Sequence, residues 1–140
     1  MLLARPESLI ALSDAGAHVS VLCDAGYATH LLGRWVRERG LFGWEEAVRR
    51  LSAMPAAIYG IPERGLLAPG RVADVVCFDP TRVAASAPEK VRDFPGGAAR
   101  YVVRAEGIEH VFIRGEEFMA RGEWTGAHPG AVLDGSAGGR

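Results

Sequence analysis

A run of apolar positions near the start of the chain predicts a buried strand. Leu9-Ile10-Ala11-Leu12 are four consecutive apolar residues, which is typical of a strand covered on both faces in a parallel sheet. Asp14 follows where this strand would end, and a carboxylate at such a point can bind a metal ion or transfer a proton. Because Asp14-Ala15-Gly16 is also ordinary turn sequence, a turn role for Asp14 stays open at this stage.

Three helices are expected after a Gly- and Ala-rich loop that reaches Gly26. The first is predicted to start at Thr29, a good N-cap, and to stop at Gly40, with apolar residues at helical spacing: Leu31, Leu32, Trp35 and Val36. The second is predicted over 44–52, with acidic residues in its first turn and basic residues in its last turn, and with a buried stripe of Ala47, Val48 and Leu51. The third is predicted over 55–59, with Pro55 at its first position.

The second half of the chain predicts strands. Residues 65–70 are expected to form a short strand and a Pro-Gly turn, and residues 73–79 form a longer strand that Pro80 ends. Residues 81–100 are rich in Ala, Pro, Gly and charges and are expected to be an irregular connector. The remaining pattern predicts a strand over 101–103, a hairpin of 111–113 and 116–120 around Arg114-Gly115, and a flexible tail over 127–140.

These elements do not make a self-contained parallel sheet. A strand buried on both faces needs parallel neighbours, but here one such strand is followed by three helices and then by several short strands. We therefore expect an α/β arrangement that is the C-terminal part of something larger.

Composition narrows the class of protein. The chain has 140 residues, of which 49% are hydrophobic, enough for one domain with a core and too many for a disordered chain. The net charge of -1 argues against nucleic acid or an acidic membrane as a partner, and Arg34, Arg37 and Arg39 are expected to form a solvated helix face. With no signal peptide or spanning segment in the sequence, we expect a cytoplasmic protein.

Several segments resemble the amidohydrolase superfamily, in particular its D-aminoacylase (N-acyl-D-amino-acid deacylase) branch. Ser13-Asp14-Ala15-Gly16-Ala17-His18 and residues 29–39 are similar to the last barrel strand and helix of that superfamily. Residues 52–60 resemble its helix with a Pro-Ala pair, and residues 65–79, with a Pro-Gly turn and an Ala-Asp strand, resemble its return to a small β-sandwich. Residues 107–115 resemble the closing strand pair, and Trp124-Thr125-Gly126 resemble the tail.

The resemblance implies both a fold and a reaction. Residues 1–60 would be the last strand and helices of a TIM-like (β/α)8 barrel, incomplete here, and residues 61–126 would be strands of the small β-sandwich. The reaction would be metal-dependent hydrolysis of a linear amide, from an N-acyl-D-amino acid to a D-amino acid and a carboxylate. Zinc held on earlier strands would activate water, and Asp14 would be the catalytic base and acid and a metal neighbour. Ser13 and His18 are expected to contact this small-molecule substrate.

The chain departs from the superfamily pattern in its metal ligands. The superfamily's His-x-His pair is absent among His18, His30, His110 and His128, and the two cysteines have no CxxC spacing. A barrel also needs about 250 residues. We therefore expect this chain alone to hold no tightly bound zinc and to be inactive. Because the flanks of residues 9–12 would be open, we expect it to self-associate, to need an upstream barrel fragment or to be poorly stable.

Other interpretations stay open at this stage. The missing ligand set would also suit a non-catalytic scaffold or oligomer-contact module, and the same superfamily includes cyclic-amide hydrolases of the hydantoinase or dihydroorotase type. His18 has a structural loop role as its alternative. Asp24 is expected to cap a turn, with a place in the site as the alternative, and Asp74 and Asp79 are expected to be turn or cap residues.

Overall fold

The N-terminal segment is irregular where the sequence predicts a strand. The computed structural model describes residues 2–10, 13 and 17–133. Leu9 and Ile10 are half-buried and belong to no strand, so the strand prediction is wrong for these two residues. The physical reason is a lack of partners, because every strand in the described ranges pairs antiparallel and the first begins at Val75. The rest of the predicted strand, residues 11–12, lies outside the described residues.

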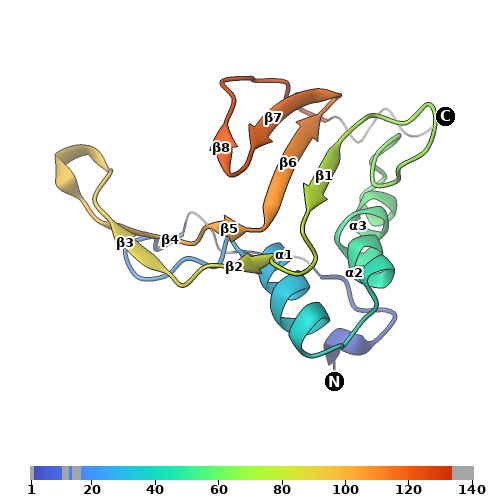
Figure 1. The fold of residues 1–140 in the computed structure, drawn as a ribbon, viewed down its shortest axis with the longest axis horizontal. Coiled ribbons are helices and arrows are strands. Elements are labelled where there is room, and N and C mark those ends of the chain that lie inside the picture. Colours follow the sequence, from blue (N-terminus) through green and yellow to red (C-terminus); the bar gives the residue numbers. More distant parts are fainter. Residues whose placement is uncertain (1, 11–12, 14–16, 134–140) are drawn as a thin grey trace.

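The three predicted helices are present; the second starts at Trp44 as predicted, and the first and third start earlier than predicted (Figure 1). After a short 3₁₀ helix, η1 (Leu2–Ala4), the chain forms α1 (Tyr27–His30), the π-helix η2 (Leu31–Glu38), α2 (Trp44–Leu51) and α3 (Ala53–Ile58). Thr29 is not the N-cap: Gly26 holds that position, and the Thr29 hydroxyl donates back to the Gly26 carbonyl at 3.2 Å. Gly40 ends η2 as predicted. It has φ of 60°, and its amide donates a hydrogen bond to the Val36 carbonyl oxygen.

The sequence predicts Pro55 at the first position of the third helix, but Pro55 lies at the third position of α3. The shift costs no hydrogen bond, because the first four amides of a helix have no partner within it. The amide that proline lacks would have been one of these. The helix ends before Gly60, which has φ of 63°.

Four of the strands form an antiparallel sheet with the order β1-β6-β7-β8. Its members are β1 (Val75–Phe78), β6 (Ile108–Ile113), β7 (Glu116–Ala120) and β8 (Glu123–Trp124). The predicted strand over 73–79 and the predicted hairpin are thus confirmed. Arg114 and Gly115 both have positive φ, 54° and 84°, the geometry of a two-residue type I′ turn. No strand occurs at residues 65–68, although the Pro69-Gly70 turn is present.

Residues 81–100 are not simply an irregular connector. They contribute two short strands, β2 (Ala84–Ala85) and β3 (Glu89–Val91), which pair with β5 (Ala105–Glu106) and β4 (Arg100–Val102). A 3₁₀ turn, η3 (Pro95–Gly97), lies between β3 and β4. We call residues 81–106, which carry β2 to β5, the ribbon; its β3–β4 end extends away from the helices and from the four-stranded sheet (Figure 1).

The core is small and lies where η2 and α2 meet the start of the ribbon. Leu32, Val36, Ala47 and Val83 form it, and Ala47 and Val83 are fully buried. Gly33 lets η2 approach the chain closely, because a Cβ there would lie 2.7 Å from the Val83 carbonyl oxygen. The predicted stripe of α2 is right for Ala47 and Leu51. It is wrong for Val48, which is 40% exposed.

Arg50 ties the N-terminal segment to α2. Its guanidinium donates to the carbonyl oxygens of Leu3 at 3.1 Å and Arg5 at 2.9 Å, and to Glu46 at 2.6 Å. The group also lies 4.5 Å from the Phe42 ring centre. The side chain is only 4% exposed, so this arginine is a buried connection between segments and not only a complement to the helix dipole.

The described residues have mixed helix and strand content and form no closed barrel. Within the same ranges, none of the helices combines the length and the apolar character needed to cross a bilayer.

Candidate functional site

Among the described residues, Ser13 and Asp24 form a contact next to the predicted catalytic residue in the sequence. The Ser13 hydroxyl donates to Asp24 Oδ1 at 3.0 Å. Ser13 is half-buried and Asp24 is exposed. Asp14 itself lies outside the described residues, so its predicted role stays a prediction.

His18 opens a turn beyond this contact. Its backbone has φ of 51°, a left-handed conformation that histidine adopts more readily than most residues. Its carbonyl oxygen accepts from the amides of Val21 at 2.8 Å and Leu22 at 3.1 Å. The residue is exposed, so the structural turn role is present, and the predicted substrate contact stays a prediction.

The other histidines lie apart in the fold and have ordinary surroundings. His30 is exposed on α1. His110 Nδ1 lies 2.6 Å from Glu117 Oε1 across the β6–β7 pair, and the His128 ring packs edge-on against Trp124 at 4.9 Å. Among the residues that the structure describes, no three His, Cys, Asp or Glu side chains gather as a metal site would require.

Asp74 and Asp79 have the predicted turn and cap roles. Asp74 pairs with Arg64 at 2.7 Å and accepts the Arg114 amide of the β6–β7 turn at 2.9 Å. Asp79 accepts the Thr81 hydroxyl at 2.6 Å and the Thr81 amide at 2.8 Å. These two hydrogen bonds hold the pKa of Asp79 below its ordinary value.

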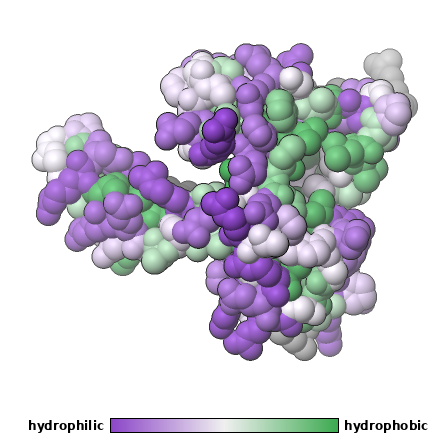
Figure 2. Space-filling view, viewed as in Figure 1, coloured by the Kyte–Doolittle hydropathy of each residue, from purple (hydrophilic) through white to green (hydrophobic). Residues whose placement is uncertain are grey.

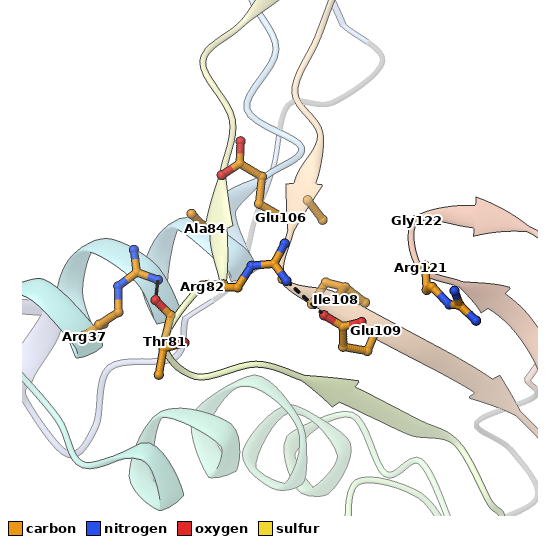
Figure 3. Close-up of a pocket in the computed structure, with 11 residues that line it drawn as sticks. Arg37, Thr81, Arg82, Ala84, Glu106, Ile108, Glu109, Arg121 and Gly122 are labelled. Atoms are coloured by element: carbon orange, nitrogen blue, oxygen red, sulfur yellow. Dashed lines mark hydrogen bonds and ion pairs between the residues drawn. The ribbon is translucent and has the colours of Figure 1, made fainter.

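A polar cavity of about 590 Å³ lies between η2, the start of the ribbon and the sheet (Figure 3). Arg37 reaches the carbonyl oxygens of Thr81 at 3.2 Å and Val83 at 2.7 Å, so it joins η2 to this chain segment. The prediction of a solvated role is therefore wrong for Arg37. Arg82 lies 3.7 Å from Glu109. The positive charges of the arginines and the negative charges of the glutamates that line this cavity nearly cancel. None of the predicted site residues lines it.

A second hollow of similar volume is mostly apolar, and we call it the apolar groove. Hydrophobic surface gathers between β1 and the helices α2 and α3 (Figure 2). Its apolar lining comprises Leu32, Val48, Leu51, Leu66, Leu67, Val75, Val76, Phe78 and Ile108. Leu67 is 78% exposed and Val76 is 53% exposed, so the structure leaves this lining open.

The sequence analysis did not connect Ser13 with Asp24. The available signal was weak: two polar residues at the ends of a Gly- and Ala-rich loop, 11 positions apart. Cys23 and Cys77 are free thiols, as their spacing predicts.

Comparisons with known proteins bear on the identity of the chain. A model of the amidohydrolase family matches residues 1–116. Among curated proteins of Alcaligenes xylosoxydans xylosoxydans, D-aminoacylase is 36% identical over 108 residues, and N-acyl-D-glutamate deacylase is 41% identical over 90 residues. These matches cover 77% and 64% of the chain, and 20% and 17% of the relatives. A dihydroorotase of Lactobacillus johnsonii matches a shorter stretch, 43% identical over 49 residues, covering 35% of the chain and 12% of that relative.

Solved structures agree with these matches. A crystal structure of D-aminoacylase has a TM-score of 0.63 and 37% identity over 78% of the chain. A structure of N-acyl-D-glutamate deacylase from Bordetella bronchiseptica, with zinc and a phosphonate inhibitor, has a TM-score of 0.55 and 39% identity over 77% of the chain. Both matches cover 21% of the solved chain. The chain therefore spans about a fifth of the length of these relatives, and it belongs to the amidohydrolase family.

Proposed function

We propose that this chain carries the catalytic base and acid of an enzyme that hydrolyses N-acyl-D-amino acids. The observation that supports the proposal is the identity of 36% and 41% to two deacylases named for D-amino acid substrates. The chain spans about a fifth of their length. The proposal therefore concerns the activity of this chain together with the rest of an amidohydrolase barrel.

The proposed chemistry assigns one proton transfer cycle to Asp14. Its carboxylate takes a proton from the attacking water as the new carbon–oxygen bond forms at the amide carbon. It then gives this proton to the amine nitrogen as the carbon–nitrogen bond breaks, which releases a carboxylate and a D-amino acid. Since the Ser13 hydroxyl already donates to Asp24, we assign the contact with the substrate carboxylate to His18 and place Ser13 in the lining.

Zinc accompanies the Bordetella deacylase, and we propose the same metal for the complete enzyme, where it would lower the pKa of a bound water. The described residues do not fit a zinc ion on their own, because they hold no cluster of three or more suitable ligands. No step above is therefore assigned to the metal.

The same proposal includes a domain organisation. We infer that residues 1–60 complete the end of a (β/α)8 barrel and that residues 61–126 belong to a small β-sandwich. The four-stranded sheet and the helix-rich first part are consistent with this division. A cytoplasmic location stays a prediction.

A hybrid enzyme tests the function. The matched segment of the Alcaligenes D-aminoacylase is replaced by this chain, and release of D-amino acids from N-acyl-D-amino acids is measured with zinc. We expect turnover that Asp14→Asn lowers by about 10²–10⁴-fold, the usual contribution of a general base. Asp79→Asn, which keeps a turn-capping oxygen, is the control. Ordinary turnover in the Asp14→Asn hybrid would show that the proposed role is wrong.

A cyclic-amide hydrolase is the second candidate, supported by the shorter match to dihydroorotase. The same hybrid is assayed with dihydroorotate and with N-acyl-D-amino acids. Faster ring opening than deacylation would favour this candidate. A non-catalytic module predicts no turnover of either substrate by a hybrid that folds and binds zinc.

A further inference from the structure

The segment over 17–26 passes near β3 and β4 in Figure 1 and contacts β4. Tyr101 in β4 donates its amide to the Val19 carbonyl oxygen at 2.7 Å. The other edge of β4 pairs with β3. This backbone hydrogen bond therefore attaches the segment to the edge of β4 that β3 leaves open.

The end of the segment fits tightly against the base of the ribbon. A Cβ on Gly26 would lie 2.7 Å from Val103 Cγ1 and 3.1 Å from Ala85 Cβ. Contacts under 3.0 Å require a shift of one group, so glycine is needed for this approach. Gly26 is also the N-cap of α1, which means that the helix start and the ribbon meet at one residue.

Two contacts thus hold the segment, at Val19 and at Gly26. Asp24 lies between them in the sequence.

We propose that Asp24 is a positioning residue for Ser13, and that the ribbon holds the segment from which Asp24 reaches it. The Ser13 hydroxyl donates to Asp24 Oδ1 at 3.0 Å, and Ser13 directly precedes Asp14 in the sequence. This inference rests on the proposed function of Asp14. A general base must be held within about 0.5 Å of its productive position, so a fixed residue beside it matters for rate.

Residues 81–106 thus do more than connect β1 to β6: they support the segment over 17–26. The ribbon contacts the segment through β4, the segment carries Asp24, and Asp24 binds Ser13. Loss of any link should loosen Ser13, whereas a change elsewhere on the sheet should not.

Amide hydrogen exchange of the 140-residue chain tests the contact without any need for activity. Asp24→Ala removes the acceptor, and we expect exchange at residues 13–14 to become at least about 10-fold faster, equivalent to about 1.4 kcal/mol. Asp24→Asn keeps an acceptor oxygen and should exchange like the wild type. Glu123→Ala, an exposed acidic residue on β8, is the matched control. Equal exchange in Asp24→Ala and the wild type would overturn the proposal.

The ribbon contact is tested in the same measurement. Gly26→Ala introduces a methyl group against Val103, and we expect faster exchange over residues 17–24 and at Ser13. Adding Val103→Ala removes the closest atom, Cγ1, and should return part of the protection. If Gly26→Ala loosens residues 17–24 and leaves Ser13 unchanged, the ribbon does not support Ser13.

The hybrid enzyme separates this inference from the proposed function. We expect Asp24→Ala to lower kcat about 10-fold with little change in KM, and Asp24→Asn to restore most of it. If Asp14→Asn abolishes turnover but Asp24→Ala leaves kcat unchanged, the positioning role is wrong and the proposed function stands. If Asp14→Asn keeps its turnover, the proposed function fails, and the exchange data alone decide whether Asp24 holds Ser13.

Discussion

Two neighbouring arginines on α2 occupy very different surroundings. Arg49 and Arg50 both bind Glu46. The Arg49 side chain is 48% exposed, whereas that of Arg50 is 4% exposed. Arg50 also donates hydrogen bonds to the carbonyl oxygens of Leu3 and Arg5. The local sequence does not separate the two residues, because the difference comes from a segment more than forty positions away.

Replacement of Arg50 should therefore be costly. Arg50→Met keeps an apolar stem but leaves the Leu3 and Arg5 carbonyl oxygens without their donor. We expect a loss of roughly 2–4 kcal/mol in the free energy of unfolding, measured by urea denaturation. Arg49→Met is the matched control and should cost less than about 1 kcal/mol, as exposed ion pairs do. Equal costs for the two variants would contradict the buried connection.

Glu46 should make the stability of the chain depend on acid. Hydrogen bonds from Arg49 and then Arg50 lower its pKa from 4.5 to about 2. Because the pKa is depressed in the folded state, this stabilisation is complete above about pH 5 and is lost as the pH falls towards 2. We expect the urea midpoint of Glu46→Gln to fall less steeply than that of the wild type between about pH 5 and pH 2.5. Parallel curves would show that Glu46 makes no such contribution.

At the scale of elements, η2 is held against the start of the ribbon by close backbone contact. Gly33 is buried, and a Cβ there would lie 2.7 Å from the Val83 carbonyl oxygen and 3.1 Å from Ala84 Cα. We expect Gly33→Ala to cost roughly 1–3 kcal/mol through overpacking, despite the higher helix propensity of alanine. Thermal unfolding followed by circular dichroism measures the change.

A matched control comes from the same helix. Arg34 is exposed and pairs only with Glu38 in the described part of the chain, one turn away. Arg34→Ala should change the free energy of unfolding by less than about 0.5 kcal/mol. If Gly33→Ala stabilises the chain instead, the backbone contact with residues 83–84 is looser than the distances indicate.

Elements that depend on neighbouring residues could be predicted from the sequence, whereas elements that depend on contacts between distant positions could not. The helix over 44–51 and the hairpin at Arg114-Gly115 were predictable because caps, turn residues and periodicity act over a few positions. The ribbon was missed because β2 and β3 pair with strands that lie about 10–20 positions later. The Ser13–Asp24 contact, 11 positions apart, has the same character, since no local pattern joins Ser13 to a residue of the later loop.

At the scale of the whole molecule, the chain exposes more surface than its size requires. Its accessible surface is 9495 Å². A folded monomer of 14.9 kDa is expected to expose roughly 7000 Å². The surplus of roughly 2500 Å² is comparable to the area that permanent protein interfaces bury. The projecting ribbon and the open apolar groove both contribute to it.

The apolar groove should therefore drive association when the chain is studied alone. In a solution of the pure chain, a second copy is the partner that can cover Leu67 and Val76, so we expect the mean mass by light scattering to rise with concentration. Leu67→Glu introduces a charge into the groove and should shift the mass towards that of the monomer. Leu2→Glu changes another exposed leucine, outside the groove, and should leave the association unchanged. A constant monomer mass in the wild type, or the same effect from both variants, would show that the groove is not the associating surface.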